Sequence, residues 1–245
     1  MTKNYYIEIN NIKIPANIRN YKNAKSIKIY FKDTVLNVTK PYKVTLKLIT
    51  EIIRKNEKQI YEQYQKSLEN YRKNIINWKT GEIIYYKGEK YVINRTIYNK
   101  TKLGIEIDIN KNRFNIYVPE GLEELIIKKG LDNIVKKIFK NNTEVLLQDR
   151  LPYWSKITKI QYNQFKVRDA ISKYGSCVPK TRMLHFTSRL IMLPPEQIDA
   201  IIVHELCHII HPNHSKEFYN LVKRYIPDYD IKRKWLKENS NIILI

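Results

Sequence analysis

The sequence predicts an α+β protein in which a helix that carries a histidine motif packs on a small mixed sheet, preceded by β-hairpin and helix units. Two observations support this fold class. Segments with apolar residues at alternate positions, typical of strands, are followed by segments with helical apolar spacing. A Pro-Pro-Glu sequence near the C-terminal end then opens a further apolar helix. The expected domains are 1–79, 80–153 and 154–245.

The first unit begins with a predicted hairpin over 26–39, whose strands turn near Asp33. Pro41 follows and ends the second strand. From about Thr45 the apolar spacing becomes helical, and this helix is expected to run through Tyr71.

The second unit has the same order of elements. The segment 113–119 is similar to the segment 35–41, at an offset of 78 residues, and a helix is predicted after each. This similarity has two explanations, an internal duplication or a chance likeness between two short hairpin and helix units. The elements expected here are a hairpin over 81–91 that turns at Lys87-Gly88, strands over 105–109 and 114–118, and a helix over 122–147.

The third segment begins near Trp154 and contains the histidine motif. Its expected elements are strands over 157–167 and 182–188, a helix from Pro195 to about Ile210, a helix over 215–224 with Ser215 as its N-cap, and a terminal helix over 231–237.

The net charge of +21 raises the question of a nucleic-acid partner. Residues 1–150 carry 30 basic and 16 acidic side chains, and residues 151–245 carry 15 and 8, so the excess is spread along the chain. Lysines outnumber arginines by 34 to 11, although arginine is the better phosphate ligand. A solvated basic surface is therefore favoured over a nucleic-acid site.

Compartment and redox state follow from simple counts. The first residues lack the apolar core of a signal peptide, and no apolar run reaches the roughly 18 residues that span a bilayer, so a cytoplasmic location is expected. The only cysteines are Cys177 and Cys207, and both are expected to be thiols.

The residues that carry chemistry lie in His204-Glu205-Leu206-Cys207-His208. Histidines four positions apart share one face of a helix, so their rings can bind one metal ion, while Glu205 lies about 100° round from His204 and can reach a water molecule. Three protein ligands and one open position are typical of catalytic zinc. His214 is preferred as the third ligand, because Pro212 should end the helix and let the chain turn back; His211 is its rival.

Other residues are weaker candidates. Arg189 or Tyr229 is a candidate for stabilising an oxyanion, and His185 for contacting substrate, although a structural hydrogen bond fits His185 equally well. Asp199, five residues before His204, is a candidate second-shell carboxylate, with solvent exposure or helix capping as the more common role. Cys177 is either a thiol near the metal or a packing residue.

The motif, together with Pro212-Asn213-His214-Ser215 and the upstream Lys173-Tyr174-Gly175-Ser176-Cys177, resembles the YgjP-like metallopeptidase family, a zincin group related to the SprT-like proteases. The resemblance implies a zincin-like catalytic domain, one Zn²⁺ per chain held by His204, His208 and His214, catalysis by Glu205, and a protein or peptide substrate. Two alternatives stay open. One is a DNA-associated protein that acts on DNA-bound proteins, as the SprT-like relation implies, and the other is a protein with a structural zinc.

Overall fold

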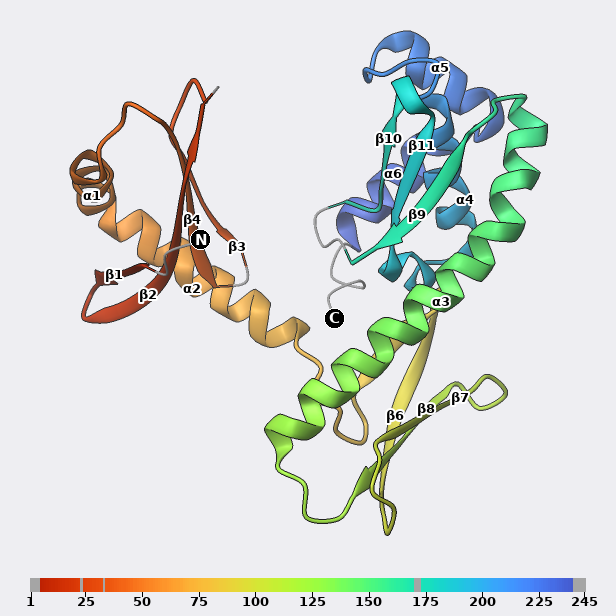
Figure 1. The fold of residues 1–245 in the computed structure, drawn as a ribbon, viewed down its shortest axis with the longest axis horizontal. Helices are drawn as coiled ribbons and strands as arrows, with labels where there is room; N and C mark the ends of the chain where they lie inside the picture. The colour runs from red at the N-terminus through yellow and green to blue at the C-terminus, as the bar shows by residue number, and fades with distance from the viewer. Residues whose placement is uncertain (1–4, 23, 33, 170–172, 240–245) are drawn as a thin grey trace. The chain divides into compact units, whose positions relative to one another are not determined.

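The computed structural model describes residues 5–22, 24–32, 34–169 and 173–239, and Asp33, the expected turn residue, lies outside them (Figure 1). The chain forms two compact units, Met1–Ile75 and Ile76–Ile245. Within the described residues, no helix combines the length and the apolar character that crossing a membrane requires.

The first unit is a four-stranded sheet covered on one face by two helices. Its strands are β1 (Tyr5–Ile9), β2 (Ile12–Tyr21), β3 (Lys28–Lys32) and β4 (Val35–Pro41). They are arranged in the order β1-β2-β4-β3, with β2 and β4 parallel and the other pairs antiparallel. The β3–β4 pairing confirms the hairpin expected over 26–39, whereas β1 and β2 were not anticipated.

The helix expected from Thr45 through Tyr71 is two helices, α1 (Leu46–Lys55) and α2 (Glu57–Asn74). Asn56 separates them because its side-chain amide donates to the Ile52 carbonyl, 2.8 Å away, in competition with the regular helical hydrogen bonds. Thr45 is the N-cap of α1. The two helices bury the apolar face of the sheet, and the core contains Ile14, Leu36, Val38, Ile49, Ile53 and Ile60.

The second unit begins with a sheet of the same topology as the first. Its strands are β5 (Ile83–Tyr86), β6 (Glu89–Tyr98), β7 (Gly104–Asp108) and β8 (Arg113–Pro119), in the order β5-β6-β8-β7. The pairing directions agree strand by strand, and Tyr21 opposite Pro41 corresponds to Tyr98 opposite Pro119. The first turn of each sheet also has two residues with positive φ. These agreements support the internal duplication.

Helix α3 (Glu124–Thr158) is 35 residues long, or about 52 Å, and continues eleven residues past its expected end at Leu147. Leu147, Leu151 and Ser155 are all buried, so the buried stripe continues at helical spacing. Pro152 is tolerated because it lies on the exposed face, where water can reach the carbonyl that loses its partner. The expected boundary at 153/154 therefore falls inside a helix.

The segment after α3 forms the mixed α+β part of the unit. Its strands are β9 (Gln164–Arg168), β10 (Gly175–Val178) and β11 (Met183–Thr187), and β11 is central, antiparallel to β10 and parallel to β9. The strand expected over 157–167 begins only at Gln164, because 157 and 158 belong to α3. Two short 3₁₀ segments, η1 (Pro179–Thr181) and η2 (Ser188–Met192), are followed by α4 (Pro195–Cys207), α5 (Lys216–Tyr225) and α6 (Tyr229–Glu238).

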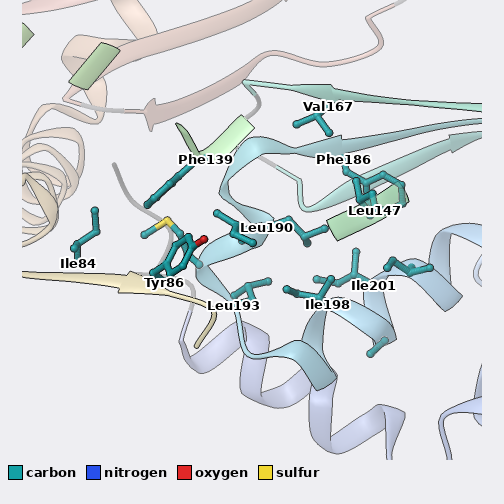
Figure 2. Close-up of a cluster of buried hydrophobic side chains, with 14 of the residues drawn as sticks. Ile84, Tyr86, Phe139, Leu147, Val167, Phe186, Leu190, Leu193, Ile198 and Ile201 are labelled. Atoms are coloured by element: carbon teal, nitrogen blue, oxygen red, sulfur yellow. The ribbon is translucent and has the colours of Figure 1, made fainter. Parts of the chain in front are cut away.

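One hydrophobic core joins the β5–β8 sheet, α3 and α4. Figure 2 shows Tyr86 and Phe139 close to Leu190 and Leu193, with Ile198 beyond them on α4. The turn of the β5–β6 hairpin also contacts η2 through the backbone, since the Lys87 N–H donates to Ile191 O at 2.6 Å and the Gly88 N–H to Met192 O at 3.1 Å. The segments expected to be separate domains, 80–153 and 154–245, thus share one core.

The contact between the hairpin turn and the residue that caps α4 can be tested at Gly88. A Cβ there would lie 2.6 Å from Cα of Pro194, whereas a Cβ at Gly81 would meet nothing within 4 Å. Both glycines have positive φ, +85° and +92°, so backbone strain affects both substitutions alike. We expect Gly88→Ala to destabilise the protein by roughly 1–3 kcal/mol more than Gly81→Ala in thermal or denaturant unfolding. Equal losses would show that the close approach to Pro194 is unimportant.

Candidate metal centre

Helix α4 carries the first part of the histidine motif and is buried on almost every side. Pro195 suits the first turn, since its fixed φ is helical and its missing N–H would have no partner there. From Gln197 to Cys207 only Asp199 and His204 are less than fully buried. The helix ends at Cys207, not near Ile210 as expected, because the chain tightens into a turn after it and the Ile210 N–H donates to Cys207 O at 3.1 Å.

Three histidine nitrogens converge beside the end of this helix. The Nε2 atoms of His208 and His214 lie 3.1 and 3.2 Å from Nε2 of His204. Among the described residues these three form the cluster able to hold a metal ion. The turn after α4 brings His214 back to the motif, whereas the side chain of His211 is not in the cluster.

Two of the histidines contact polar groups at the ring nitrogen opposite the cluster, and for His208 this contact sets the tautomer. Nδ1 of His208 lies 3.1 Å from the carbonyl oxygen of His211, which can only accept, so Nδ1 carries the proton and Nε2 keeps its lone pair. Nδ1 of His204 lies 2.6 Å from the hydroxyl of Tyr229. Burial, reinforced by the neighbouring histidines, lowers the pKa of His204 to about 3, so its ring is neutral at physiological pH.

The ring of Phe218 packs against the rings of all three histidines. It is fully buried, and its ring centroid lies 4.9, 4.4 and 5.0 Å from those of His204, His208 and His214. Ser215 positions Phe218, because its hydroxyl accepts the Phe218 N–H at 3.3 Å as the N-cap of α5. Phe218 therefore contacts the rings of His204 and His208, which precede the turn after α4, and the ring of His214, which follows it.

The cluster fits a tetrahedral zinc ion. Zn–N distances of about 2.0–2.1 Å at tetrahedral angles separate two ligand nitrogens by about 3.3 Å, close to the two separations found here. Because the Nδ1–H of His208 donates to the His211 carbonyl, the lone pair of His208 Nε2 points into the cluster, which favours a cation there. The hydroxyl of Tyr229 and the carbonyl of His211 lie where second-shell partners orient metal-ligating histidines.

Glu205 lies beside the cluster in an apolar environment. Its side chain is 5% exposed, and burial raises the pKa of its carboxyl to about 8, against the opposing charge of Lys173. Oε2 is buried without a hydrogen-bond partner among the described residues. Gly175 leaves room for this carboxylate, because a Cβ on Gly175 would lie 2.7 Å from both Cγ and Oε1.

The histidines and Glu205 open into a cavity of about 740 Å³. One wall is β10, with Gly175, Ser176 and Cys177, and another comes from α6, with Arg233 and Leu236. β10 is an edge strand, so within the described part of the chain its outer side carries no neighbouring strand. An extended chain could pair with this edge beside Glu205.

Asp199, the candidate second-shell carboxylate, has another role. Arg150 of α3 donates from Nε to Oδ1 at 2.9 Å and from its terminal nitrogen to Oδ2. Five residues before His204 correspond to about 140° of helix rotation, which turns Asp199 away from the ligands and toward α3. The structure therefore places Asp199 in a contact between helices.

The other candidates are placed as follows. Cys177 lines the cavity, and burial and the charge of Glu205 raise the pKa of its thiol to about 11. Tyr229 also lines it, but its hydroxyl faces Nδ1 of His204. His185 lies on β11, which pairs with a strand on each side and therefore offers no free edge. Arg189 is buried in η2, and a terminal nitrogen of its guanidinium group lies 3.9 Å from Oδ1 of Asp169. Neither His185 nor Arg189 is among the described residues that line the cavity.

Sequence reasoning missed several residues of the cavity. Lys173 lines the cavity, and its positive charge lowers the pKa of Glu205 against the effect of burial. Arg233 also lines it and donates to the Tyr219 hydroxyl at 3.0 Å. Tyr219 in turn stacks on His214. Gly175 entered the sequence analysis only as part of the segment 173–177 that resembles the family. No local pattern identifies Arg233, because it lies 29 positions after His204 in the sequence and α6 alone brings it to the cavity.

Comparison with known proteins identifies the family of the chain. No curated protein matches the chain significantly. Two solved structures do, the metallopeptidase zymogens of Pyrococcus abyssi abylysin and Methanocaldococcus jannaschii jannalysin, at 19% and 20% identity. The matches cover 38% and 36% of this chain and 93% and 94% of those chains, with TM-scores of 0.34 and 0.32. The family model for the YgjP-like metallopeptidase domain matches residues 25–239, and the chain therefore belongs to the YgjP-like metallopeptidase family.

Proposed function

We propose that the protein is a zinc-dependent peptidase in which His204, His208 and His214 bind the metal and Glu205 is the general base. The observation that carries this proposal is the convergence of three Nε2 atoms beside a buried carboxylate that has no hydrogen-bond partner in the described structure. Family membership supports metallopeptidase activity, and the histidine geometry favours zinc among the metals.

The reaction assigned to this site is hydrolysis of a peptide bond. The metal would supply positive charge that polarises the carbonyl and lowers the pKa of water. Glu205 accepts a proton from water as the water oxygen attacks the carbonyl carbon, and it returns this proton to the amine nitrogen when the C–N bond breaks. Its apolar surroundings suit a group that must bind and release a proton near neutral pH.

The substrate is proposed to be a protein or peptide in extended conformation. The outer edge of β10 offers backbone groups for pairing, and Gly175 brings this edge within contact distance of Glu205. His185, the earlier candidate for substrate contact, is less suited because its strand is internal. Tyr229 is proposed to orient His204 instead of stabilising an oxyanion, since its hydroxyl faces the ring nitrogen remote from the other histidines.

A structural zinc site is the main alternative, and the ligand count argues against it. Structural zinc has four protein ligands, whereas the described residues supply three in this cluster. Cys177 lines the same cavity, but burial raises the pKa of its thiol to about 11, which disfavours the thiolate that zinc requires.

Metal content tests the ligand set. The purified chain is expected to hold one zinc ion by mass spectrometry, and His214→Ala should lose it or bind it far more weakly. His211→Ala is the matched control, because His211 contributes only its backbone carbonyl, and this variant should keep the metal. Loss of zinc in His211→Ala with retention in His214→Ala would refute the assignment.

Glu205→Gln tests the general base. The amide keeps the shape of the side chain but cannot accept the proton, so hydrolysis of an unfolded protein such as casein should fall by about 10²–10⁴-fold while one zinc per chain is retained. Undiminished hydrolysis would exclude Glu205 as the base.

The same variant should change the pH dependence of stability when the metal is removed by a chelator. The pKa of Glu205 is about 8 in the folded chain and 4.5 as the reference value, so between these pH values the folded state holds the proton more tightly. Wild-type stability therefore falls as pH rises through this window, by up to about 1.4 kcal/mol per pH unit. Melting temperatures are measured from pH 5 to pH 9. The melting temperature of Glu205→Gln should rise relative to that of wild type as the pH increases to about 8, and the difference should then stay constant. Parallel curves would contradict a raised pKa.

A further inference from the structure

The two repeated sheets provide an internal comparison. Their strand registers assign equivalent positions: Tyr30 opposite Asn37 corresponds to Glu106 opposite Asn115, and Lys28 opposite Thr39 corresponds to Gly104 opposite Tyr117. Each sheet buries one face, and residues at alternate strand positions form its outer face. Any difference between the outer faces is therefore not required by the fold.

The outer face of the first sheet combines exposed tyrosines with basic side chains. Arg19 of β2 and Lys28 of β3 flank Thr39 in one row across the sheet, and both are exposed. Tyr21 and Tyr30 lie two residues further along these strands, on either side of that row, and are 54% and 48% exposed. We call Arg19, Tyr21, Lys28 and Tyr30 the outer patch. The same face also holds Tyr6, which is 67% exposed.

The second sheet lacks this combination. The positions that correspond to Arg19, Lys28 and Tyr30 hold Thr96, Gly104 and Glu106. Glu106 accepts a hydrogen bond from the Tyr117 hydroxyl at 2.9 Å, so this part of the face is neutral to acidic. The same scaffold thus carries two different surfaces.

The net charge is distributed unevenly between the two structural units. Residues 1–75 carry 16 basic and 6 acidic side chains, a net charge of +10, and residues 76–245 carry 29 and 18, a net charge of +11. The first unit therefore holds almost half of the excess in less than a third of the chain. The count divided at residue 150 did not show this concentration, because that division lies inside the second unit.

We propose that the outer patch binds single-stranded nucleic acid. Bases would stack on the exposed rings of Tyr21 and Tyr30, and Arg19 and Lys28 would neutralise the phosphates between them. Exposed aromatic rings on a sheet face suit unpaired bases, because in a duplex the faces of the bases are stacked on one another and inaccessible. Charge alone would select any polyanion, whereas the rings select one that has aromatic bases.

The test measures fluorescence anisotropy of a labelled oligothymidylate of about 20 nucleotides, a length that spans a sheet-sized site. The double variant Arg19→Thr/Tyr30→Glu introduces the residues that the second sheet holds at equivalent positions, so the fold has a precedent for them. Lys58→Glu is the matched control: it changes the charge by the same amount, on exposed surface of α2. All variants are made in the 245-residue chain, and unchanged melting temperature and metal content verify that each variant is folded.

We expect the wild type to bind with steep salt dependence and the double variant to bind at least about tenfold more weakly, with Lys58→Glu within about twofold of wild type. Tyr21→Ser/Tyr30→Ser should also weaken binding but leave the salt slope unchanged, because it removes stacking and no charge. Equal losses in Lys58→Glu and the double variant would overturn the proposal in favour of diffuse charge. So would absence of binding at low salt, tighter binding of duplex DNA, or equal binding of polyglutamate or phosphatidylserine vesicles.

Discussion

The burial of helix α4 is the condition on which the candidate site depends. Apolar side chains surround the helix along almost its whole length, so His204 and Glu205 are held away from water in fixed positions. Loss of solvent favours the neutral form of both groups, which leaves His204 with a free lone pair and gives Glu205 an affinity for protons near neutral pH. A solvated helix with the same motif would present the same residues with ordinary acidities. The packing of α3, β10, α5 and α6 against α4 thus sets both geometry and chemistry.

The second repeat supports this helix from one end. Its β5–β6 turn donates two backbone hydrogen bonds to η2, which leads directly into α4, and its helix α3 continues across the unit to bind Asp199 through Arg150. The hairpin and helix unit therefore shares one hydrophobic core with the elements that hold the candidate site. The first repeat has the same strand order, but its outer face holds different residues from that of the second repeat.

Local features of the site were predictable because they depend on neighbours in sequence. The spacing of His204 and His208, the proline at the start of α4 and the Ser215 cap of α5 all act within one or two helical turns. The strands of the two hairpins were predictable from alternation in the same way. Asp199 could not be assigned correctly, since its partner Arg150 is 49 residues away on another helix. The predicted end at Leu147 was too early, because α3 continues through Pro152, which lies on its exposed face.

The sequence by itself determined the α+β class, the repeated hairpin and helix order, the family and the residues able to bind a metal, because each rests on local spacing or on a motif. Only the tertiary structure decided between His214 and His211 for the cluster, placed the hydroxyl of Tyr229 against His204, and put the edge of β10 beside Glu205. Those choices arise from contacts between segments far apart in the chain, such as Tyr229 with His204 and Gly175 with Glu205. Burial, which changes the acidity of His204 and Glu205, is likewise a property of the packed molecule.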